Sequence, residues 1–178
     1  METDIQLYMK TEPQWCELRD SVYSKLFDHA EKLLRANPRL VTLTNSVGET
    51  VLDYFAVEND IEGVAWLRNH GFSLNTRSDL GTPLVFEVAD LGYMDLLLWF
   101  SQNGADFSVL DEDNRGIFEH LLDGLEQELL EPSTEERAKT YWRQHEQTIR
   151  FLTENIPGIS MSEEQQMLFS ALSERAAR

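Results

Sequence analysis

The chain has 178 residues, 42% of them hydrophobic, and a formal net charge of −17. This length suits one ordinary domain. So negative a surface repels phosphate groups and anionic lipid heads, which argues against nucleic acids and membranes as partners.

Three features of the sequence bear on the cellular location of the protein. No apolar run approaches the roughly 18 residues that a membrane-spanning helix needs. Cys16 is the single cysteine, which excludes an intramolecular disulfide and suits a reducing environment. The acidic N-terminus has no apolar stretch behind it, which predicts that no secretory signal is present. A cytoplasmic location is therefore expected.

The first predicted elements are helical. Thr11-Glu12-Pro13 is typical of a helix start, and apolar residues follow at helical spacing from Trp15 to Leu34. We interpret residues 1–44 as an elongated N-terminal helical cap and first structural unit.

The central part of the chain repeats itself every 33 residues. A shift of that length superimposes Gly48 on Gly81, Ala56 on Ala89, Trp66 on Trp99 and Gly71 on Gly104. A fixed period of this size indicates a helical solenoid, in which each unit buries its apolar face against its neighbour. The paired tryptophans are expected to pack between neighbouring outer helices.

The residues within the period indicate the kind of repeat. One unit opens with Gly81-Thr82-Pro83-Leu84 and closes with Gly104-Ala105-Asp106, which resembles the ankyrin repeat. Thr82 is expected to cap the first helix, with Pro83 in its first turn. Gly71 and Gly104 are expected to end the second helices in the left-handed conformation.

The resemblance implies an all-α fold, an ankyrin-like helical solenoid of stacked antiparallel helix pairs with terminal capping helices. We expect one domain over residues 1–178, with central repeats at 45–122 and an extended last unit and capping helix at 123–178. Hairpin-like fingers should join the units. Because Gly116 lies 35 residues after Gly81, the last finger is expected to be two residues longer than the one before it.

The last unit contains a charged stretch over residues 123–143. Pro132 to Glu136 offers a new helix start, so a long helix is predicted from about Thr134 to Asn155, with Pro157-Gly158 stopping it. Ser160 to Glu163 resembles a capping box. A final helix should bury an apolar stripe formed by Met167, Leu168 and Leu172.

Motifs for catalysis and metal binding are absent from the sequence. There is no phosphate-cradling glycine loop, and the four histidines are far apart. His70 is expected to serve the last carbonyls of a helix, and His120 to be a solvated or core-edge histidine rather than a groove residue. Residues 111–114 superficially resemble a calcium loop but lack its central glycine and its final bidentate glutamate. We therefore predict no catalytic residue, no metal and no cofactor.

The negative charge is concentrated in the repeats. Residues 45–122 hold 14 acidic and 3 basic residues, a net charge of −11. This distribution predicts a basic protein partner, because opposite charge speeds encounter. The alternative is that the charge serves solubility alone.

The ankyrin resemblance implies a protein-binding module with a concave face and no small-molecule substrate. The finger tips and the exposed side of the inner helices would supply the partner-binding residues Glu49, Asp53, Glu58, Asp79, Leu80, Phe86, Asp90, Asp111, Glu112, Asp113 and Arg115. Small acidic proteins of this kind include immunity proteins, so we predict neutralisation of a cognate toxin or effector. The alternatives are a general adaptor or scaffold, and an enzyme with its chemistry in residues 123–143.

Overall fold

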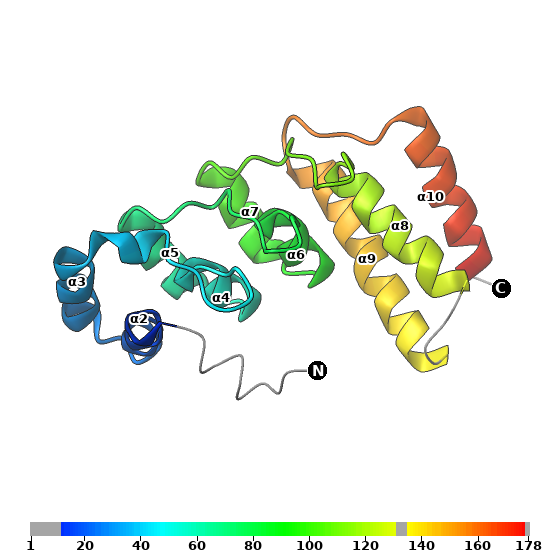
Figure 1. Ribbon diagram of the computed structural model, residues 1–178. Helices are drawn as coiled ribbons and strands as arrows, with labels where there is room; N and C mark the ends of the chain where they lie inside the picture. Colours follow the sequence, from blue (N-terminus) through cyan, green and yellow to red (C-terminus); the bar gives the residue numbers. More distant parts are fainter. Residues whose placement is uncertain (1–11, 131–134, 177–178) are drawn as a thin grey trace. The chain divides into compact units, whose positions relative to one another are not determined.

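The computed structural model describes residues 12–130 and 135–176 (Figure 1). Over these ranges the chain forms α-helices, one short 3-10 helix and no β-strand, apart from an isolated antiparallel bridge between Arg77 and Pro83. The predicted all-α class is confirmed. The contacts group the chain into two compact units, Met1–Leu84 (unit 1) and Val85–Arg178 (unit 2). The stacking of all helix pairs into one ankyrin-like array stays a prediction.

The described part of unit 1 consists of two helix pairs. Their bounds are α2 Pro13–Tyr23 and α3 Phe27–Ala36, followed by the 3-10 helix η1 Pro38–Val41, and then α4 Val51–Val57 and α5 Ile61–Asn69. The helices of each pair pack against each other, and α2 also packs against α4. The predicted cap is therefore itself a helix pair. Lys25 lies between α2 and α3 with a left-handed φ of 58°, which separates the two helices of this pair.

Aromatic and small side chains hold the pairs of unit 1 together. Trp15 and Phe55 are buried, and Gly63 lets α5 approach Phe55 so closely that an added Cβ would lie 2.5 Å from the ring. Trp66 stacks on Phe27 with ring centroids 5.2 Å apart. This contact confirms that Trp66 packs between the second helices of neighbouring pairs.

Unit 2 contains the longer helices. Their bounds are α6 Leu84–Asp90, whose first residue still belongs to unit 1, α7 Met94–Gln102, α8 Ile117–Leu130, α9 Glu135–Asn155 and α10 Glu163–Ala176. Helix α8 packs against α9 and α10, and α7 packs against α9; Figure 1 shows α8 and α9 side by side. The predicted long helix is thus present as α9, whereas its expected start signal at residues 132–134 lies outside the described residues.

The 33-residue period is preserved in the backbone. The first helices α4, α6 and α8 begin at Val51, Leu84 and Ile117, and the turns before them contain Gly48, Gly81 and Asn114 at φ 84°, 73° and 59°. The expected lengthening of the last finger is therefore wrong. Asn114 takes the left-handed position that glycine holds in the other turns, which asparagine tolerates better than most residues. Gly71 and Gly104, at φ 95° and 86°, confirm the predicted left-handed helix ends.

The start of α6 is shifted by one residue from its predicted position. Thr50 caps α4 from the position immediately before Val51. One period later that position is Pro83, which directly precedes α6 and joins the bridge to Arg77. The prediction that Thr82 caps this helix with Pro83 inside its first turn is thus one residue out of register.

The start of α10 is shifted by two residues. Its capping box joins Ser162 to Gln165: the Ser162 amide donates to the Gln165 side chain at 2.9 Å, and the Gln165 amide donates to the Ser162 hydroxyl at 3.2 Å. The apolar stripe shifts with it, because Phe169 and Leu172 are buried while Met167 is 74% exposed. Ser160 to Glu163 is therefore not the capping box.

Candidate functional site

Three turns of one design lie 33 residues apart, over residues 45–49, 78–82 and 111–115. In each turn the amide of the first residue donates to the carbonyl of the fifth, at 2.8, 3.0 and 3.0 Å. In the first and third turns, the side-chain oxygens of Asn45 and Asp111 also accept from two amides within the turn. Each turn is therefore closed by hydrogen bonds from its own residues.

The residues at the tips of these turns project into solvent. The second and third positions of the turns are occupied by Ser46-Val47, Asp79-Leu80 and Glu112-Asp113. Leu80 is 82% exposed and Val47 is 45% exposed, and the Asp113 side chain is 74% exposed. The structure thus places four predicted partner-binding residues, Asp79, Leu80, Glu112 and Asp113, at exposed tips.

Other predicted binding residues stabilise the turns themselves. The Asp111 side chain is only 5% exposed, and Arg115 contacts Asp111 at 2.8 Å, Asp113 at 3.1 Å and Asp123 at 3.1 Å. In the first turn, Asn45 donates to the Glu49 carboxylate at 2.7 Å. Because these groups already have partners within the chain, they support the tips.

Two predicted binding residues lie in the core. The Asp53 carboxylate accepts from the Thr50 amide at 2.8 Å and from the Thr76 hydroxyl, and burial raises its pKa despite these hydrogen bonds. Phe86 is completely buried. Neither side chain is available to a partner, because each is committed to helix capping or packing. Glu58, at the end of α4, is exposed.

Asp90 belongs to a polar cluster in unit 2 that the sequence analysis did not find. Its carboxylate lies 2.8 Å from His120 Nε2 on α8 and 3.4 Å from His145 Nε2 on α9. The shorter contact is a hydrogen bond; the longer one is electrostatic, since His145 Nε2 has no hydrogen bond of good geometry. The Gln144 side chain donates to the Asp90 carbonyl. Asp90 therefore ties α6 to α8 and α9.

The charges of this cluster reinforce one another. Burial alone would raise the pKa of Asp90, but the contacts with His120 and His145 lower it overall. The hydrogen bond to Asp90 raises the pKa of His120, and Asp111 faces the other ring nitrogen of His120 at 3.8 Å. Burial raises the pKa of nearby Tyr141 to about 12. The arrangement favours a protonated His120 between two carboxylates.

The stability of unit 2 should therefore depend on pH through His120. A raised pKa means that the stabilisation is complete below about 6.5, the pKa of unfolded histidine, and is lost as pH rises through the folded value. We expect His120→Gln to cost about 1 kcal/mol at pH 6 and progressively less toward pH 9. Urea denaturation of both proteins across this range measures the difference. A difference that is constant with pH would contradict the ion pair.

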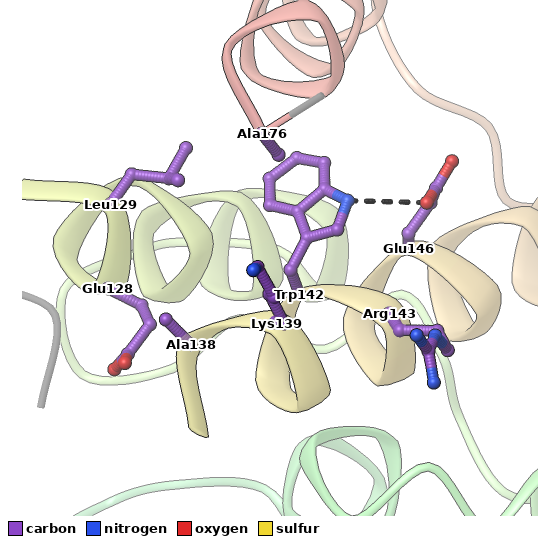
Figure 2. Close-up of a pocket in the computed structure, with 8 residues that line it drawn as sticks. All are labelled: Glu128, Leu129, Ala138, Lys139, Trp142, Arg143, Glu146 and Ala176. Atoms are coloured by element: carbon purple, nitrogen blue, oxygen red, sulfur yellow. Dashed lines mark hydrogen bonds between the residues drawn. The ribbon is translucent and has the colours of Figure 1, made fainter. Parts of the chain in front are cut away.

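A pocket of about 510 Å³ lies among α8, α9 and α10 (Figure 2). Figure 2 shows the Trp142 indole next to Ala176, with its Nε1 donating to Glu146 at 3.3 Å. The lining carries two acidic and two basic side chains, which are Glu128, Glu146, Lys139 and Arg143. These charges balance, so the pocket suits an uncharged apolar group better than an ion.

Among the described residues, no three histidine, cysteine, aspartate or glutamate side chains are arranged to hold a metal ion. No helix within those ranges combines the length and apolar character that crossing a bilayer requires. No family model matches the chain, and no curated protein matches it either.

Proposed function

We propose that the chain is a non-enzymatic module that binds a basic protein, and that it neutralises a toxin or effector by covering a basic surface of that partner. The observation that carries this proposal is the set of exposed tips, Asp79-Leu80 and Glu112-Asp113, on turns closed by their own hydrogen bonds. A rigid support lowers the entropy lost on binding. An exposed leucine beside carboxylates suits a partner surface that is basic and partly apolar.

The repeated geometry supports a recognition role. A turn, with a left-handed residue at Gly48, Gly81 or Asn114, precedes a helix every 33 residues. This regularity is expected of an ankyrin-like repeat. Turn tips that project from such repeats are free of core packing, which leaves their side chains available to a partner. Residues 45–122 carry a net charge of −11, so the partner surface that meets these tips is expected to be positively charged.

The proposal predicts association that depends strongly on salt. We expect the on-rate with a partner captured from the source cells to fall at least tenfold between low and high ionic strength, because screening removes electrostatic steering. Stopped-flow or surface-binding kinetics measure this rate. A partner with toxic activity should lose that activity when the chain is bound. A salt-independent on-rate, or tight binding to DNA instead, would overturn the proposal.

A further inference from the structure

Three helices of unit 2 build the walls of the pocket shown in Figure 2. Its apolar lining consists of Leu129 on α8, Ala138 and Trp142 on α9, and Ala176 on α10. These four side chains are half-buried. Because α8 packs against both α9 and α10, the walls are part of the helix packing itself. The pocket is therefore formed before any ligand arrives.

The Trp142 ring is held in one orientation. Its Nε1 donates to the Glu146 carboxylate at 3.3 Å, and Arg150 pairs with the same carboxylate at 2.9 Å. The Arg150 guanidinium also lies 5.5 Å from the centre of the Phe169 ring on α10. This series of contacts joins α9 to α10 and fixes the indole as a flat aromatic wall beside Ala176 (Figure 2).

The size and the walls of the pocket suit a small organic molecule. Its volume is about 510 Å³, within the range of roughly 300–1,000 Å³ that is typical of small-molecule sites. An apolar ligand would remove the half-buried surfaces of Leu129, Trp142 and the two alanines from water, which is favourable. An aromatic ring gains further, because it can stack in an offset manner or meet the indole edge-on.

The charges around the pocket favour an uncharged ligand. Glu146 already has two partners, Trp142 and Arg150, so it offers little to a cation. An anion could approach Lys139 and Arg143, but it would also meet Glu128 in the lining and a chain with a net charge of −17. A buried ion that is incompletely paired costs free energy, and a neutral ligand avoids this cost.

We propose that the pocket binds an uncharged aromatic molecule of low molecular mass, with its ring against the Trp142 indole. None of the described residues that line the pocket belongs to a turn tip. The site is therefore separate from the surface assigned to the basic partner, and it does not depend on the proposed function.

The test uses two fluorescent probes with the same ring system, titrated into the full chain. N-phenyl-1-naphthylamine is uncharged, whereas 8-anilino-1-naphthalenesulfonate carries one negative charge. We expect the uncharged probe to bind about fivefold more tightly, because the sulfonate would be incompletely paired. Its affinity should fall about tenfold in Ala138→Phe, because the new ring occupies the space of the ligand.

The matched control is Ala171→Phe, the same change at an exposed position of α10 outside the lining. It should keep the affinity within about twofold. Trp142→Phe retains an aromatic wall and should also bind within about twofold, but it removes one of the four tryptophans. Energy transfer from tryptophan to the bound probe should therefore drop in this variant. Circular dichroism checks that each variant is folded.

Three results would show that the pocket is not such a site. These are tighter binding of the sulfonate probe, unchanged affinity in a folded Ala138→Phe chain, and undiminished energy transfer in Trp142→Phe. If the chain sediments as a dimer and probe affinity falls as protein concentration rises, a second copy fills the pocket instead. The salt dependence of association with the basic partner is measured separately, so either proposal can fail alone.

Discussion

Replacing Gly48 with valine is expected to lower the free energy of unfolding by about 3 kcal/mol, through two effects that add. At φ 84° a β-branched residue is strained. In addition, the new Cβ would lie 2.6 Å from the backbone nitrogen of Asp79, which forces the first two turns of unit 1 apart. Chemical denaturation followed by circular dichroism measures the loss.

The control for this substitution is Gly104→Val. Gly104 has nearly the same backbone angle, φ 86°, but a Cβ there would meet no atom within 4 Å. Only backbone strain remains, so we expect a loss of about 1 kcal/mol. Equal losses in the two variants would mean that the turns of unit 1 do not approach each other as described.

Reversing the charge of the exposed turn tips should weaken binding to a basic partner by about 3 kcal/mol. The variant carries Asp79→Lys, Glu112→Lys and Asp113→Lys, and like charges would then face each other across the interface. The fold should survive, because exposed substitutions change stability by about 0.5 kcal/mol or less each. Calorimetry with the partner measures the affinity, and thermal unfolding checks the fold.

A second charge-reversal variant distinguishes the effect of the tip residues from the effect of the total charge. Glu163→Lys, Glu164→Lys and Glu174→Lys change the total charge by the same amount at exposed positions of α10. This variant should bind with nearly unchanged affinity at physiological salt, where charges beyond about 8 Å are screened. If the α10 set abolishes binding and the tip set does not, the binding surface lies on α10.

Much of the backbone could be predicted because glycine and proline carry direct conformational information. Gly71 and Gly104 were assigned to left-handed positions from spacing alone, and both are there. The third turn lies at the predicted residues, but its predicted lengthening is wrong because the left-handed counterpart of Gly81 is Asn114 and not Gly116. Asparagine at 114 gives a weaker signal, since it also occurs in many other conformations.

The roles of polar side chains were harder to predict, because they depend on contacts that spacing does not reveal. Thr50 and Asp53 form a capping box, a pattern that is present in the sequence and assigns Asp53 to helix capping rather than to partner binding. By contrast, His145 lies far from Asp90 in the chain, and no local pattern joins them.

The self-contained hydrogen bonding of the turns has an evolutionary consequence. The hydrogen bond between the first and fifth residues of a turn joins backbone groups, so Asp79, Leu80, Glu112 and Asp113 can be exchanged at little cost to folding, about 0.5 kcal/mol or less each. Selection by a changing partner can therefore act on these positions alone. Lineages of this protein would be expected to diverge fastest at the tips while keeping Gly48, Gly81 and Asn114, so that the specificity of recognition changes while the scaffold persists.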